Sequence, residues 1–155
     1  MTRILVLALL ILSAGPAMAR GRAPVPAQAP AQAAVPRPRV MMCELIDESG
    51  TGWVPEFVMF TRQTGGPHAG RLEVFDPLLQ TLVRHPIEAY VTEDTPARRT
   101  YGWALAKVHN SAGQFTERMD FRLTVQKADG SAAIAVVAQG YDNVMRGRGR
   151  CAVPE

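Results

Sequence analysis

Residues 115–127 read FTERMDFRLTVQK and carry the strongest fold signal in the chain, because apolar and polar side chains alternate along them. One set of alternate positions is mainly apolar: Phe115, Met119, Phe121, Leu123 and Val125. The other set is polar: Thr116, Arg118, Asp120, Arg122, Thr124 and Gln126. This period of two is typical of a β-strand with one buried face and one face in water. Turn-forming sequences flank it at 110–113 and 128–131, so we expect antiparallel hairpins on both sides.

Neighbouring segments predict further strands. Residues 100–109 place Tyr101, Trp103 and Leu105 on one face and small side chains on the other, which permits close packing or leaves room beside the sheet. Residues 132–138 form a short apolar run suited to a central strand. Earlier candidates are 53–61, 71–75 and 87–92.

One short helix is expected near 77–83, between the second and third of these earlier strands. Asp76 is a good N-cap, and Pro77 is favoured at the first helical position. An apolar stripe follows at helical spacing, formed by Leu78, Leu79, Leu82 and Val83. Pro86 ends the pattern.

Together these segments predict an all-β, mainly antiparallel domain over residues 40–155. Six or seven strands, joined mostly in sequence order, fit either a small up-and-down barrel or a two-sheet sandwich. A domain of this length buries enough surface for one core.

Residues 1–19 have the pattern of a secretory signal peptide. Arg3 supplies a positive charge, residues 4–12 are apolar, and small side chains at Ala17 and Ala19 precede Arg20. A membrane-spanning helix needs roughly 20 apolar residues, so a permanent transmembrane anchor is not expected. The pattern predicts cleavage after Ala19 and a periplasmic or secreted location.

Residues 20–39 form a proline- and alanine-rich segment with four arginines and no acidic residue. Such a composition favours an extended, flexible linker. The chain has a formal net charge of +3, yet residues 40–155 hold 12 basic and 14 acidic side chains, which gives the domain −2. The positive charge therefore lies mainly outside the domain, and no nucleic-acid partner is expected.

The two cysteines, Cys43 and Cys151, stand at opposite ends of the predicted domain. In an exported chain an isolated pair of this kind predicts a disulfide. Closing so long a loop constrains the unfolded chain by about 4.7 kcal/mol in the chain-entropy treatment.

The motifs for several chemistries are missing from the sequence. The histidines do not have metal-ligand spacing, and there is no nucleophile elbow, P-loop or dinucleotide fingerprint. We therefore expect no metal, no cofactor and no catalytic residue. A hydrolase-type enzyme centred on His85 or His109 ranks third among the possible functions.

Aromatic side chains and arginines give the candidate ligand site. Clustered tryptophan and tyrosine make good walls for sugars or apolar ligands, although they pack equally well in a core. The alternating stretch 146–150 puts its arginines on one face, where they bind an anion or pair with acidic side chains of the domain. The candidate residues are Trp53, Tyr101, Trp103, Tyr141, Arg148 and Arg150.

Two non-catalytic functions remain. The first is an exported interaction or structural module of the cell envelope, with an envelope component as partner. The alternative is a β-barrel that binds a small apolar or sugar ligand in an interior lined by aromatic and arginine side chains.

Overall fold

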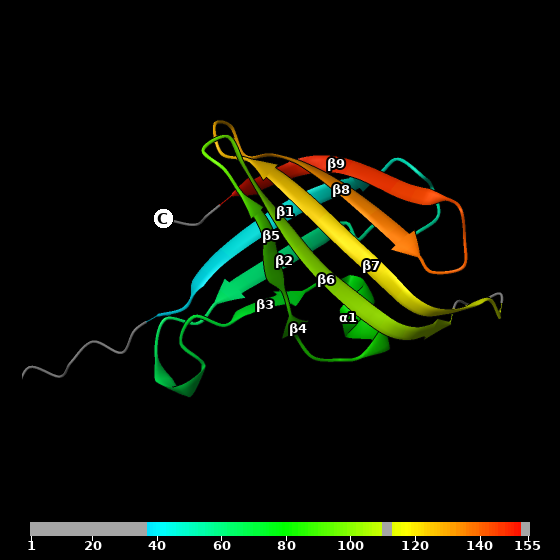
Figure 1. Ribbon diagram of the computed structural model, residues 1–155, viewed down its shortest axis with the longest axis horizontal. Helices are drawn as coiled ribbons and strands as arrows, with labels where there is room; N and C mark the ends of the chain where they lie inside the picture. The colour runs from blue at the N-terminus through cyan, green and yellow to red at the C-terminus, as the bar shows by residue number, and fades with distance from the viewer. Residues whose placement is uncertain (1–36, 110–112, 153–155) are drawn as a thin grey trace, which may run out of the picture. The chain divides into compact units, whose positions relative to one another are not determined.

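The computed structural model describes residues 37–109 and 113–152, which form one antiparallel sheet curled into a nearly closed barrel (Figure 1). The predicted signal peptide at 1–19 and most of the predicted linker lie outside these residues. The strands are β1 (Arg39–Asp47), β2 (Phe57–Arg62), β3 (Leu72–Phe75), β4 (Ile87–Glu88), β5 (Tyr90–Asp94), β6 (Arg98–His109), β7 (Phe115–Gln126), β8 (Ser131–Ala138) and β9 (Val144–Ala152). A 3₁₀ turn, η1 (Gly66–His68), and one helix, α1 (Pro77–Leu82), complete the described elements.

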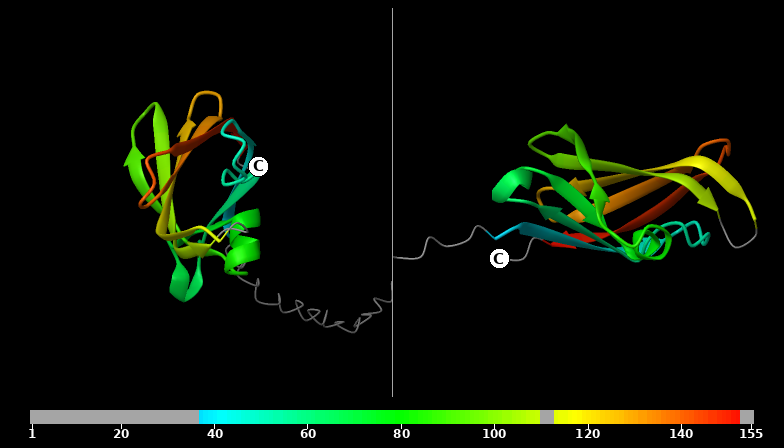
Figure 2. Two further views of the ribbon diagram at one scale, coloured as in Figure 1. Left: turned by 90° about the vertical axis from the view of Figure 1, so that its right-hand side faces the viewer. Right: turned by 90° about the horizontal axis from the view of Figure 1, so that it is seen from below.

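The strand order in the sheet is β4-β3-β2-β1-β9-β8-β7-β6-β5, and every neighbouring pair is antiparallel. The two edge strands, β4 and β5, are separated in sequence only by Ala89. One extended segment therefore pairs first with β3 and then with β6, which almost closes the ring (Figure 2). This arrangement is the up-and-down barrel, and the two-sheet sandwich is excluded.

The described strands number nine, where six or seven were expected. The difference has two causes. Strand β1 was not among the candidates, and the segment predicted at 87–92 divides into β4 and β5. The strand predicted at 53–61 begins only at Phe57, so Trp53 and Val54 belong to the loop that follows β1. The short helix forms where it was predicted.

Aromatic rings fill the middle of the barrel. The ring of Trp103 stacks on Phe121 with centroids 5.1 Å apart, and it meets Phe60 edge-on at 5.6 Å. Phe60 also stacks on Tyr101 at 4.5 Å. Trp103 is 0% exposed. The barrel centre is therefore a packed core, as the size of aromatic side chains favours.

Two face assignments at the start of β7 are wrong. Phe115 was expected in the core but is 39% exposed, whereas Thr116 was expected in water and is buried. The facing strand is also irregular here, since Lys107 has a φ of 54°. The Thr116 hydroxyl lies 2.8 Å from the carbonyl oxygen of Arg118 and 2.9 Å from that of Gln139, so the buried hydroxyl is satisfied.

The first and last strands, β1 and β9, pair with each other in the middle of the strand order. Cys43 and Cys151 face each other directly across this pair and form the expected disulfide. Gly149 lies next to the cross-link on β9. A Cβ atom there would overlap the carbonyl oxygen of Glu44 and would lie 2.9 Å from the Cα of Leu45. Glycine thus allows the backbones of the first and last strands to approach closely.

Helix α1 is held by its N-cap. One carboxylate oxygen of Asp76 accepts a hydrogen bond from the backbone N–H of Leu79, at 2.8 Å, while the other oxygen is buried without a donor among the described residues. Burial raises the pKa of Asp76 to about 6, against the smaller lowering effect of backbone hydrogen bonds from Leu79 and Leu78. The cap anchors Leu79 in the core, where it is fully buried.

Substitution of Gly149 by alanine tests the close approach of β1 and β9. We expect Gly149→Ala to lower the free energy of unfolding by about 2 kcal/mol or more, because the added methyl group meets the backbone. Gly102→Ala is the matched control. Its Cβ would meet the ring of Tyr90, which is 49% exposed and free to swing away. We expect the control to change stability by less than about 1 kcal/mol. Equal losses in urea titrations of both variants would contradict the account.

Asp76 predicts a specific pH dependence of stability. Since its pKa is about 6 in the fold against an ordinary value of 3.8, the folded state binds this proton more tightly than the unfolded state. Protonation of Asp76 therefore stabilises the fold by about 3 kcal/mol below about pH 4, and this stabilisation is lost as the pH rises through 6. Asp76→Asn keeps an oxygen for the cap and should remove this dependence.

The measurement is the free energy of unfolding of both proteins at about pH 4 and about pH 7. Relative to Asp76→Asn, the wild-type protein should lose stability between the two values. Asp142→Asn, which removes an exposed carboxylate, serves as the control and should keep the wild-type profile. Parallel profiles for wild type and Asp76→Asn would refute the assignment.

Candidate functional site

A cleft of about 370 Å³ opens at one end of the barrel, where β1, β6 and β8 end and β7 and β9 begin. The loop between β1 and β2 and the loop between β8 and β9 form its two sides. The described lining residues are Thr51, Trp53, Val108, Gln114, Phe115, Thr116, Met119, Ala138, Tyr141, Asn143 and Met145.

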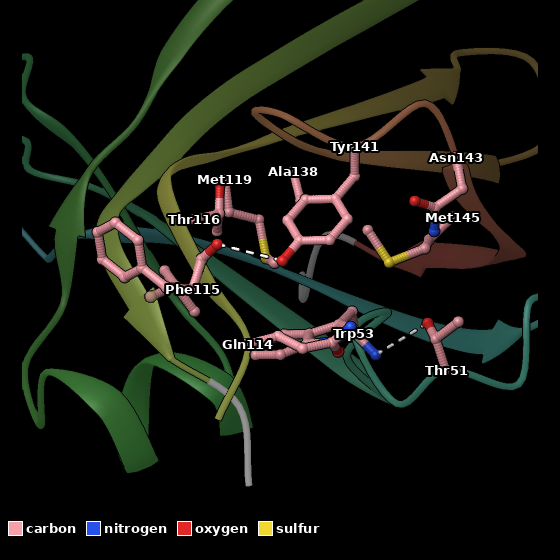
Figure 3. A pocket seen from close by; sticks show the side chains of 11 residues that line it. Thr51, Trp53, Gln114, Phe115, Thr116, Met119, Ala138, Tyr141, Asn143 and Met145 are labelled. Atoms are coloured by element: carbon pink, nitrogen blue, oxygen red, sulfur yellow. Dashed lines mark hydrogen bonds between the residues drawn. The ribbon is translucent and has the colours of Figure 1, made fainter. Parts of the chain in front are cut away.

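Two aromatic side chains form opposite walls of this cleft. Figure 3 shows Trp53 on one side and Tyr141 on the other, with the side chains of Met119 and Met145 between them. The Tyr141 hydroxyl donates a hydrogen bond to the carbonyl oxygen of Phe115 at 3.2 Å, which orients the ring (Figure 3). Both methionines are buried, whereas Trp53 is half-buried and Tyr141 is 39% exposed. The cleft thus has aromatic walls and an apolar floor.

The loop that carries Trp53 is organised by Asp47 at the end of β1. Its carboxylate accepts hydrogen bonds from the backbone N–H groups of Ser49, Gly50 and Gly52, at 2.8, 3.2 and 2.8 Å. Burial alone would raise the pKa of Asp47, but the hydrogen bonds from Ser49, Gly52 and Gly50 outweigh it and lower the pKa. One side chain therefore fixes the loop on which the aromatic wall stands.

The cleft is electrically neutral. Among its described lining residues there is no aspartate, glutamate, lysine, arginine or histidine. The polar side chains of the lining are hydroxyls and amides, from Thr51, Gln114, Thr116, Tyr141 and Asn143, and the buried Thr116 hydroxyl is already satisfied. Such a surface binds apolar or ring-shaped groups by packing and hydrogen-bonds their neutral polar atoms. The described lining holds no general acid or base that could change charge near neutral pH.

The four aromatic residues predicted from the sequence do not form a single site. Trp53 and Tyr141 share the cleft, Trp103 lies in the packed interior, and Tyr101 stacks on Phe60 toward the opposite end of the barrel. All four belong to the same barrel, but they lie at different positions along its axis. Because the middle of the barrel is packed, a ligand could bind only at one of its ends.

The predicted arginines lie on the outer face of β9. Arg148 forms an ion pair with Glu48 at 2.7 Å, and Arg150 donates a hydrogen bond to the backbone carbonyl of Asp129 at 2.9 Å. Arg146 is exposed on the same face. The arginines therefore do not line the interior, and Arg148 has the acidic partner that the sequence analysis allowed for.

Several residues of the cleft were not predicted as site residues. Met119 was assigned to the core face, and Met145 carried no signal at all. A usable signal exists in the two loops, where each wall residue directly follows a glycine: Gly52 precedes Trp53, and Gly140 precedes Tyr141. Both glycines have positive φ values, so an aromatic side chain after a tight turn in a loop marks both sides of the opening.

The histidines lie apart from one another on exposed positions. The Nδ1 atom of His85 is 2.9 Å from the carbonyl oxygen of its neighbour Pro86. The ring of His109 packs on Phe115 with centroids 4.7 Å apart, and His68 ends η1. Within residues 37–109 and 113–152, the ion pairs join arginine or lysine to carboxylates and include no histidine.

The part of the chain that the structure describes contains no group of three or more His, Cys, Asp or Glu side chains placed to hold a metal ion. Within the same residues, no helix has the length and apolar character needed to cross a membrane. The chain matches no protein-family model, and comparison with curated proteins and with solved structures found no match.

The role of Asp47 is testable by hydrogen exchange. In Asp47→Ala the amides of Ser49, Gly50 and Gly52 lose a charged acceptor, so we expect their exchange to accelerate about tenfold or more, in line with the strength of hydrogen bonds to charged groups. Glu48→Ala is the neighbouring control, since its carboxylate pairs outside the loop. Unchanged protection in Asp47→Ala would show that other contacts hold the loop.

Proposed function

We propose that this chain is an exported, non-catalytic binding protein that holds a neutral ligand, or a neutral group of a larger envelope component, between Trp53 and Tyr141. The observation that carries the proposal is the cleft itself: two facing aromatic walls over two methionines, without a charged side chain in the described lining. Of the functions expected from the sequence, ligand binding fits this geometry best, with the site at the barrel mouth instead of the interior.

The size and chemistry of the cleft indicate the class of ligand. About 370 Å³ lies within the range of small-ligand pockets. Trp53 and Tyr141 offer flat faces for a ring, and methionine side chains adapt to irregular apolar shapes. Amides and hydroxyls at the edges favour ligands that carry neutral polar groups, such as an apolar ring with a hydroxyl group or the apolar face of a sugar.

Export is supported by two independent features. The leader at 1–19 has the arrangement of a signal peptide, with small side chains before the expected cleavage point. Cys43 and Cys151 form a disulfide in the barrel, and such bonds persist in oxidising compartments. The proposed location is therefore periplasmic or extracellular.

Tryptophan fluorescence tests the proposed site directly. The chain has two tryptophans, and Trp103 is fully buried, so ligand-dependent changes in emission should come from Trp53. We expect a neutral ring-bearing compound, from a panel of aryl glycosides, aromatic alcohols and plain sugars, to change the emission saturably and to raise the melting temperature. The Trp53→Phe variant should still bind the compound, but without the change in emission. Its binding would then be detected by the rise in melting temperature alone.

Removal of either wall should weaken binding about tenfold, because an aromatic contact of this kind contributes about 1.5 kcal/mol. The variants are Trp53→Ala and Tyr141→Ala. Phe57→Ala is the control, since that residue is partly exposed and does not line the cleft. Equal affinity of all three variants for a ligand, or no response to any compound of the panel, would overturn the proposal.

A further inference from the structure

A second pocket lies at the opposite end of the barrel, where β1 and β6 begin and β7 and β9 end. Its volume is about 400 Å³, and its chemistry differs from that of the cleft because it combines cations with apolar walls. The described lining residues are Met41, Arg99, Tyr101, Val125, Gln126, Lys127, Gly130 and Cys151. The packed rings in the middle of the barrel separate the two openings.

Two cations of this pocket share one acidic partner. The Asp94 carboxylate accepts hydrogen bonds from Arg99 Nη2 and from Lys127 Nζ, each at 2.6 Å. These contacts, first with Arg99 and then with Lys127, lower the pKa of Asp94 to about 2. With two cationic side chains and one carboxylate, the cluster has a formal net charge of +1. A monoanion would complement it.

Arg99 interacts with the side chains of Asp94 and Tyr101, but one of its donors is not used. Its Nε atom is buried and has no acceptor among the described residues. A buried donor without an acceptor destabilises the protein. An anion that binds in the pocket would offer this guanidinium a charged acceptor. Lys127 likewise keeps further ammonium protons after its bond to Asp94, since an ammonium group has three donors.

Apart from the two cations, Gln126 and the Tyr101 hydroxyl, the side chains of the pocket are apolar. Tyr101 and Val125 are almost fully buried and present their side chains from β6 and β7. Met41 on β1 completes this wall; its sulfur lies 3.8 Å from the Tyr101 hydroxyl. A short hydrocarbon segment fits such a wall, whereas inorganic anions would leave it uncovered.

We infer that this second pocket binds a monocarboxylate with an apolar tail, its carboxylate held by Arg99 and Lys127 and its tail packed on Met41, Tyr101 and Val125. The inference goes beyond the proposed function, since it concerns another end of the barrel and a charged class of ligand. Arg99 and Lys127 both line the pocket, so a carboxylate that enters it can contact either one. The formal charge of +1 favours a ligand with a single negative charge.

Methionine-methyl NMR on the oxidised full-length chain tests this inference with octanoate as the probe. Met41 reports on the second pocket, whereas Met119 and Met145 report on the cleft. We expect octanoate to shift the Met41 methyl signal saturably. Octanol and octylammonium have the same tail and should bind about tenfold more weakly or not at all, since hydrogen bonds to charged groups contribute about 1.5 kcal/mol or more.

Variants identify the cations. Arg99→Gln and Lys127→Gln should each weaken octanoate binding about tenfold. Arg98→Gln is the matched control, because that neighbouring arginine pairs with Glu93 at 2.8 Å and does not line the pocket. It should keep the wild-type affinity. The comparison of octanoate with octanol needs no variant, so the test stands even where a substitution prevents folding.

Three results would overturn the inference: equal affinity for octanoate and octanol, octanoate shifts confined to Met119 and Met145, or no saturable shift of Met41 at millimolar octanoate. The second result would place octanoate in the cleft, and the other two leave the fluorescence test of the cleft unaffected. Conversely, a cleft without a ligand would leave the Met41 response intact. Failure of this inference and failure of the proposed function are therefore distinguishable.

Discussion

The pairing of the first strand with the last is the contact on which the rest of the molecule depends. The pairing of β1 with β9 joins strands β1 to β4 to strands β5 to β9 in one sheet, the Cys43–Cys151 bridge links the two paired strands covalently, and Gly149 lets their backbones approach. The same pairing assembles both openings. At one end it brings the loops bearing Trp53 and Tyr141 to either side of the cleft, and at the other it sets the start of β1 beside the end of β9. The fold and the candidate sites thus have a common origin.

The packed middle of the barrel divides the molecule into two independent ends. Trp103 packs against Phe60 and Phe121 and fills the centre, so a ligand in the cleft could not enter the interior. One end is neutral and aromatic, and the other is cationic and apolar. A barrel of this size fills its centre with side chains, and binding chemistry is left to the loops and strand ends, where residues vary without loss of the core.

Sequence periodicity predicted the central strands, because each of them alternates a core face with a water face. It missed β1, where Ile46 is exposed although apolar and the alternation is broken. It also placed Trp53 in a strand, although Pro55 has no N–H for a ladder hydrogen bond and the strand starts only at Phe57. The arginines of 146–150 were correctly put on one face, but which face is inside depends on the glycines between them and on the approach of β1. The division of the aromatics between core and cleft depends on barrel closure, which local pattern does not encode.

The middle of the barrel is a packed core, and its uncharged end holds a cleft that can accept apolar groups. A crystal structure under xenon pressure tests this central claim most directly, because xenon occupies unfilled apolar cavities. The account predicts xenon on the floor of the cleft beside Met119 and Met145, and none among Phe60, Trp103 and Phe121. Xenon bound at the centre of the barrel, or a cleft that takes up none, would contradict it.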